Sequence, residues 1–291
     1  MIITVQDFTG VYAEQPFMQE LRAAAETSKD VHWLDCTKIV GTDCYCDDDA
    51  IKEINNLIDN AQSHDNSAHV PAIHFFDNGN YHYMSKIWTD RVQEPFTLIV
   101  FDHHPDMQPP RFGGILSCGG WVKEVIDNNK FIQNAIIIGV KDELVETVRE
   151  EQSQSGEASI LDKVTFVTES DILKEIPASA GMTSSDSAIA IPKDYHFSSF
   201  ISRLSSSLYI SIDKDALSPS YAATNWDQGS LTLDALKDCI TALVTGRKIL
   251  GVDICGERAH DFEGNEQHTV QEADTLNNSL NRELVEFLKK I

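Results

Sequence analysis

Basic residues are scarce in this sequence, and their scarcity limits the partners that the chain can have. Lys and Arg together number 23 against 46 for Asp and Glu, so the formal net charge of the 291 residues is −23. A polyanion such as nucleic acid, or an anionic membrane surface, would be repelled by this charge. We therefore expect neither a nucleic-acid partner nor a membrane partner.

Long apolar runs and paired cysteine motifs are missing as well. No apolar run approaches the roughly 20 residues of a membrane helix, and the N-terminal "MIITVQDFTG" lacks the basic region and apolar stretch of a signal peptide. We therefore expect a cytoplasmic protein. The six cysteines show no CxxC spacing, so neither a disulfide framework nor a zinc ribbon is indicated.

Short apolar or β-branched runs alternate along the chain with segments of helical periodicity. Several runs are apolar at nearly every position, as strands of a parallel sheet are when helices cover both faces. This pattern predicts the α/β class, with a three-layer α/β/α architecture around a mostly parallel sheet. The predicted strands are 2–5, 31–34, 72–76, 97–101, 135–140, 164–167, 208–212 and 248–254, and the predicted helices are 13–28, 50–61, 119–129, 232–245 and 271–290.

Strands of the same character continue along the whole chain, so we expect a single domain over residues 1–291. Two segments rich in small polar residues, 151–160 and 177–190, are predicted to be mobile surface loops.

Ionisable residues follow three of the predicted strands directly. The strand 97–101 runs into Asp102, His104 and Asp106, and the strand 208–212 into Asp213 and Asp215. The strand 72–76 leads into "DNGNYHY", which contains His82. Ligands of an open parallel sheet bind beyond the carboxyl ends of its strands, and alternate residues of an extended chain point to one side. These side chains are therefore expected to converge, with His103 pointing the other way.

Four carboxylates and two imidazoles at one sheet edge would repel one another unless cations lay between them. Oxygen and nitrogen ligands without a thiolate suit Mn²⁺ or a similar ion, although other divalent ions remain open, and six protein ligands suit two ions better than one. Such a centre lowers the pKa of a shared water, so that hydroxide is available near neutral pH.

These residues resemble the motifs of the ureohydrolase superfamily, which includes arginase, agmatinase and formimidoylglutamase. The family's DAHxD motif is matched by "DHHPD", its SxDxDxxDP motif by "SIDKDALSP" and its GGDH segment by "GNYH". The resemblance implies an arginase-like fold, a binuclear manganese centre and a family in which homo-oligomers are common. It implies that His82, Asp102, Asp106 and Asp213 hold one ion and that Asp102, His104, Asp213 and Asp215 hold the other. It also implies catalytic roles for Asp106 and His104.

The residues expected around the substrate depart from the family pattern. The loop after the second aspartate pair reads "SYAATNWDQGSLT" and offers Trp226, Asp227 and Gln228 as substrate-binding candidates. The region after "DHHPD" contains no counterpart of the arginase shuttle histidine, and the family's D-x-x-E motif is replaced by the longer "DICGE". Glu257 and Asp227 are therefore alternative candidates for the acid that binds a cationic substrate.

The leading hypothesis is a metal-dependent hydrolase that cleaves a C–N bond of a guanidino, formimino or amide compound. In this hypothesis a hydroxide bridging two Mn²⁺ ions attacks a small-molecule substrate, with a cationic substrate favoured. Two alternatives stay open at this point. One is a metal-dependent small-molecule binding or regulatory protein without turnover, and the other is a deacetylase-like amidohydrolase with one zinc.

Overall fold

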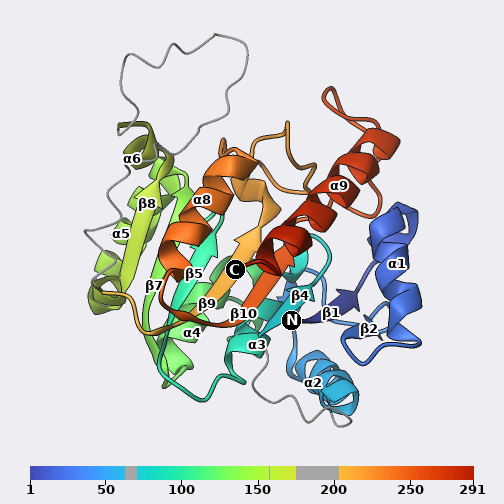
Figure 1. The fold of residues 1–291 in the computed structure, drawn as a ribbon. Helices are drawn as coiled ribbons and strands as arrows, with labels where there is room; N and C mark the ends of the chain where they lie inside the picture. The colour runs from blue at the N-terminus through green and yellow to red at the C-terminus, as the bar shows by residue number, and fades with distance from the viewer. Residues whose placement is uncertain (63–70, 157, 175–202) are drawn as a thin grey trace.

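An eight-stranded parallel sheet forms the centre of the protein (Figure 1). The structure is a computed structural model that describes residues 1–62, 71–156, 158–174 and 203–291. The strands occur in the order β2-β1-β4-β10-β9-β5-β7-β8, and every pairing between neighbours is parallel. Their bounds are β1 Ile2–Asp7, β2 Val31–Asp35, β4 Ala72–Phe75, β5 Phe96–Phe101, β7 Ile132–Val140, β8 Val164–Thr168, β9 Ser207–Asp213 and β10 Lys248–Cys255.

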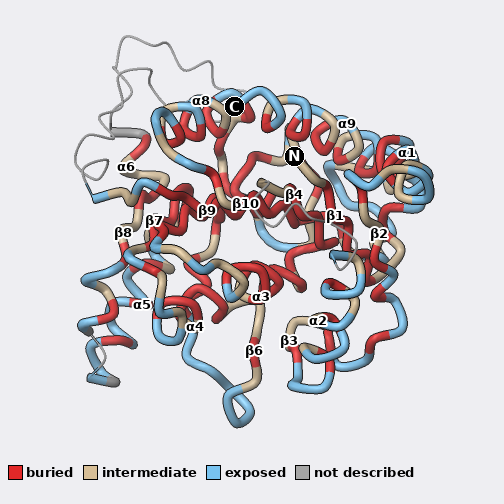
Figure 2. Tube along the Cα trace, turned by 60° about the horizontal axis from the view of Figure 1, so that its bottom comes forward, coloured by how far each residue is buried: buried red, intermediate tan, exposed pale blue. Residues whose placement is uncertain are grey.

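Helices cover both faces of this sheet (Figure 2). One face carries α1 (Pro16–Ala25), α6 (Glu169–Lys174), α8 (Leu233–Val244) and α9 (Val270–Leu288). The other carries α2 (Asp48–Gln62), α3 (Met84–Thr89), α4 (Trp121–Asn128) and α5 (Asp142–Ser155). Short 3-10 helices span Val11–Glu14, Gly79–Tyr81, Cys118–Gly120, Ala158–Lys163 and Lys214–Ala216, and a small antiparallel pair joins β3 (Tyr45–Cys46) to β6 (Leu116–Ser117). The predicted three-layer α/β/α fold is confirmed.

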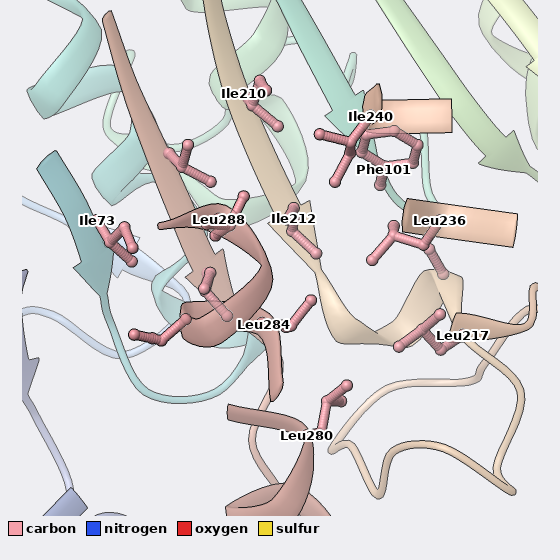
Figure 3. Close-up of a cluster of buried hydrophobic side chains, with 14 of the residues drawn as sticks. Ile73, Phe101, Ile210, Ile212, Leu217, Leu236, Ile240, Leu280, Leu284 and Leu288 are labelled. Carbon is pink, nitrogen blue, oxygen red and sulfur yellow. The ribbon is translucent and has the colours of Figure 1, made fainter. Parts of the chain in front are cut away.

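Each face of the sheet has its own apolar core. Ile210 and Ile212 of β9 point toward α8 and α9, where they join leucines of the two helices (Figure 3). Tyr209 of the same strand belongs to the cluster on the opposite face, beneath α3 and α4. Burying one such aliphatic side chain contributes about 1.5–3 kcal/mol. The two cores thus hold the sheet between its two layers of helices.

The sequence predicted all eight strands of the main sheet and the helices α1, α2, α4, α8 and α9, but not α5. The predicted loop 151–160 is wrong in part, because α5 extends to Ser155 and a 3-10 helix occupies Ala158–Lys163. The predicted loop 177–190 lies outside the described residues. Within the described ranges, no helix is both long and apolar enough to cross a bilayer.

Candidate metal centre

The carboxyl ends of the neighbouring strands β5 and β9 supply most of the candidate ligands. Asp102 follows β5 directly, Asp213 ends β9, and His82 lies just before α3. Parallel pairing sets Phe101 opposite Ile212, so Asp102 and Asp213 leave the sheet at the same level. The relative exposure of five of the six predicted ligands is 8% or less: His82, Asp102, Asp106, Asp213 and Asp215. His104 is partly exposed.

His82 lies at the centre of a first cluster of acids. Its Nδ1 atom is 3.1 Å from Asp102 Oδ2, 3.0 Å from Asp106 Oδ2 and 3.5 Å from Asp213 Oδ2. A metal ion bound by ligands about 2.1 Å away at right angles would separate those ligand atoms by about 3 Å. The spacing of His82, Asp102 and Asp106 therefore matches that of atoms sharing one ion, and Asp213 lies next to His82.

His104 forms a second cluster beside the first. Its Nδ1 atom is 2.9 Å from Asp215 Oδ2 and 3.5 Å from Asp102 Oδ1. Asp102 thus faces both histidines through different oxygens, as a bridging carboxylate would. Each set of three residues, His82 with Asp102 and Asp106, and His104 with Asp102 and Asp215, brings its ligand atoms within 4.8 Å of one another.

Hydrogen bonds outside the clusters orient these side chains. His82 Nε2 lies 2.8 Å from Ser211 Oγ, which in turn lies 2.8 Å from Ser85 Oγ. When Nε2 carries the proton toward Ser211, Nδ1 is free to bind a metal. Trp121 Nε1 donates to Asp106 Oδ2 at 2.6 Å, and the backbone of Asp106 lies in the left-handed region, at φ 48°. A non-glycine residue in that region is strained, which is a cost that functional sites often carry.

The charge balance of the centre fits divalent cations. Four buried carboxylates face two imidazoles, and Asp102 Oδ2 has no hydrogen-bond partner among the described residues. Burial raises the pKa of Asp213 to about 7, and the neighbouring Asp215 adds to the effect. Burial opposes the charged form of His82, but Cys255, Asp102 and Asp106 outweigh it and raise the imidazole pKa well above its usual value. The residues present therefore fit a pair of divalent ions that would neutralise this charge.

Two of the predicted substrate residues lie beside His104. The Trp226 ring contacts the His104 ring edge to face, with centroids 5.9 Å apart, and its Nε1 atom donates to Asn80 Oδ1 at 3.0 Å. Asp227 Oδ1 lies 2.9 Å from His104 Nε2, and its side chain is 62% exposed. Partial burial opposes ionisation of Asp227, but the hydrogen bond and charge of His104 outweigh it and lower its pKa. Asp227 thus presents a negative charge at the exposed side of the cluster.

The other two predicted substrate residues are engaged elsewhere. Gln228 Nε2 donates to two carbonyl oxygens around its own loop, those of Leu217 and Ala222. Glu257 is 1% exposed and accepts hydrogen bonds from three groups, Lys214 Nζ at 2.5 Å, Asn281 Nδ2 at 2.7 Å and Gln15 Nε2 at 2.8 Å. Both oxygens of Glu257 are occupied by protein groups, so this position does not favour the predicted contact with a substrate.

His103 turns away from the two clusters, as alternation predicts. It is buried, and its Nε2 atom lies 3.6 Å from Asp227 Oδ2. Sequence reasoning missed Ser211, Trp121 and Cys255, whose Sγ donates to Asp213 Oδ2 at 3.2 Å. Period-two spacing could have found Ser211, which precedes Asp213 by two positions on one strand face. No local signal points to Trp121.

Comparisons with known proteins identify the fold. No family model matches the chain. An uncharacterised protein of Thermotoga maritima is 24% identical over 255 residues, which cover 88% of this chain and 79% of that protein.

Among solved structures, proclavaminate amidino hydrolase from Streptomyces clavuligerus superposes with a TM-score of 0.59 at 15% identity, over 96% of this chain and 90% of that one. A formiminoglutamase variant from Trypanosoma cruzi with Mn²⁺ gives 0.57 at 12% identity, over 99% and 92%. Arginase from Bacillus caldovelox gives 0.56 at 15% identity, over 96% and 97%.

These three solved structures are ureohydrolases, and the chain has their fold. The arginase-like architecture predicted from the sequence motifs is confirmed.

Proposed function

We propose that this chain is a metal-dependent hydrolase that cleaves a C–N bond in a guanidino, formimino or amide compound, with two Mn²⁺ ions as its cofactor. The observation that carries the proposal is the pair of histidine and carboxylate clusters that share Asp102. A second support is the fold, because the structural neighbours include proteins named for amidino and formimino chemistry.

In this proposal His82, Asp102, Asp106 and Asp213 hold one ion, and Asp102, His104, Asp213 and Asp215 hold the other. When bound, two such ions would supply hydroxide near neutral pH and would act as Lewis acids during its attack on the substrate carbon. Manganese itself is proposed from the family likeness, since one structural neighbour contains Mn²⁺.

Asp106 is the residue proposed to receive a hydrogen bond from the attacking nucleophile. Trp121 occupies its Oδ2 atom and fixes the plane of the carboxylate, which leaves Oδ1 available. His104 is proposed to combine ligation with catalysis, because its Nδ1 faces the acids while its Nε2 faces Asp227 at the exposed side.

The exposed side of the centre suits a cationic or amidine-like substrate. Asp227 carries a negative charge there, and Trp226 offers an aromatic surface against which a planar cation can stack. Gln228 contributes by holding the loop that presents both residues. We propose Trp226 and Asp227 as the substrate-binding pair.

One observation favours a second candidate, a metal-dependent binding protein without turnover. Glu257 is the acid nearest in sequence to the family's substrate-binding acid. It is engaged by hydrogen bonds from Lys214 and from Asn281 of α9. The cytoplasmic location and a homo-oligomeric state stay predictions in either case.

The test is release of urea, ammonia or amine by the protein loaded with Mn²⁺, against a panel of guanidino, formimino and simple amide compounds. Turnover should disappear with a chelator and in Asp213→Ala, and it should persist in Asp238→Ala, which removes an exposed aspartate on α8. Activity in metal-free Asp213→Ala protein would refute the hydrolase proposal. Calorimetric binding of a panel compound without any turnover would support the second candidate.

A further inference from the structure

A thiol lies beside the first cluster of candidate ligands, next to His82 and Asp213. Cys255 ends β10, directly opposite Asp213 in the register between β10 and β9. It packs on the α3 face of the sheet, the face from which His82 approaches, and it is 1% exposed. The ligand atoms of Cys255, His82 and Asp213 all lie within 4.8 Å of one another.

The surroundings of this thiol are unlike those of an ordinary buried cysteine. A free cysteine in a core packs as a small apolar side chain, as Cys239 of α8 does among the leucines and isoleucines of the opposite core. Cys255 instead points its Sγ at a carboxylate oxygen, 3.2 Å from Asp213 Oδ2. Asp102 Oδ2 is buried 3.1 Å from His82 Nδ1 without a hydrogen-bond partner among the described residues, which favours a cation next to His82.

The distance from Sγ to Asp213 Oδ2 also suits two ligands of one ion. Metal–sulfur bonds of about 2.3 Å and metal–oxygen bonds of about 2.1 Å at right angles place the two ligand atoms about 3.1 Å apart. The thiol can therefore exchange its hydrogen bond to Asp213 for a bond to a shared cation with little movement. The thiol proton then leaves to solvent, and the thiolate sulfur donates an electron pair to the ion.

We propose that Cys255 is a further ligand of the ion that His82 and Asp213 hold, and that its thiolate makes this position prefer a softer divalent ion over the Mn²⁺ that the family likeness suggests there. Thiolate ligands favour Zn²⁺, Co²⁺ or Fe²⁺, whereas sets of carboxylates alone favour Mn²⁺ and Mg²⁺. The second position, around His104 and Asp215, has no thiol in its cluster of described residues and stays suited to Mn²⁺. The inference rests on the proposed two-ion centre and makes its two positions chemically unequal.

The test is titration of the metal-free full chain with Co²⁺, followed by absorption spectroscopy. Sulfur bound to Co²⁺ gives an intense charge-transfer band in the near ultraviolet, which oxygen and nitrogen ligands do not give. We expect this band in the parent protein and in the control Cys239→Ser, and its loss in Cys255→Ser. In competition titrations, the ratio of Zn²⁺ to Mn²⁺ affinity should fall at least tenfold in Cys255→Ser and stay unchanged in Cys239→Ser.

Co²⁺ binding to the parent protein without the band, or a band that survives in Cys255→Ser, would overturn the inference and leave the two-ion centre standing. A parent protein that binds no Co²⁺, or binding that Asp213→Ala does not weaken, would instead refute the proposed metal centre itself. If Cys255→Ser does not fold, X-ray absorption of the Zn²⁺-loaded parent protein decides the matter. One sulfur neighbour at about 2.3 Å supports the inference, and its absence overturns it.

Discussion

Substituting Glu257 by Gln separates its structural role from the substrate role that the sequence predicted for it. The Lys214 ammonium is 0% exposed and lies 2.5 Å from Glu257 Oε1. It also donates a hydrogen bond to the neutral Asn281 Oδ1, at 3.3 Å. Glu257→Gln keeps the size of the side chain but leaves a buried positive charge without its counterion. Breaking such a pair on one side costs about 3–5 kcal/mol.

A loss of this size is readily measured. In a domain of roughly this length one kcal/mol corresponds to about 2 °C in Tm, so we expect a decrease of about 6–10 °C. The double variant Lys214→Met with Glu257→Gln removes both charges and should recover most of the loss, because it leaves no unpaired ion. Thermal unfolding followed by circular dichroism measures both variants against the parent protein.

The kinetic outcome discriminates between the two roles. If the reasoning is correct, Glu257→Gln lowers Tm, while KM measured well below the transition changes little. A Tm within 2 °C of the parent, together with a large rise in KM, would show that Glu257 reads the substrate and that its contacts with Lys214 do not stabilise the fold.

Three further predictions concern the centre and its exposed side. Asp213 and His82 must both lose a proton to bind a cation, and both pKa values are raised, that of Asp213 to about 7 by burial and that of His82 well above its usual value by neighbours that outweigh burial. Metal affinity measured by calorimetry should therefore fall at least about tenfold per pH unit below pH 7; affinity that is constant from pH 7 to 5 would contradict this. Gly256→Ala places a Cβ against the Asp213 carboxylate and 2.7 Å from the Lys214 backbone nitrogen, at a φ of 90°. We expect it to lower the free energy of unfolding, measured in urea, by at least about 2 kcal/mol. The control Gly246→Ala, which has open space around its Cβ, should lower it less. Asp227→Asn should raise KM for a cationic substrate about two- to fivefold with an unchanged metal content, the range of an exposed ion pair; an unchanged KM would remove Asp227 from the substrate site.

The strands were predictable because their apolar runs are nearly continuous, and that pattern is set by burial on both faces. Helix α5 was not, since its sequence "DELVETVREEQSQS" is mostly polar and buries few apolar residues, among them Val145 and Val148. The helix ends at Gly156, which is in the left-handed conformation. A glycine can be recognised as a helix C-cap only when the helix before it has been predicted.

The candidate ligands were predictable for a local reason as well. Alternation after a strand is a short-range property, and it brings Asp213 and Asp215 to the side of the two histidines without knowledge of the rest of the chain. The direction of Glu257 is a long-range property, because it depends on Gln15, which is 242 positions away in sequence. Partners supplied by distant elements cannot be inferred from the spacing of a motif.

The segment Asp213–Lys214–Asp215 has consequences for how this chain can vary. Its two acids face the histidines, while the lysine between them neutralises Glu257 on the opposite side. A deletion or insertion of one residue just before it would exchange the two sides, directing an ammonium at the site meant for cations and two acids at a buried glutamate. Length changes here would therefore disable the centre and the fold in one step. The loop bearing Trp226, with its exposed side chains, is the place where new specificity can arise without that penalty.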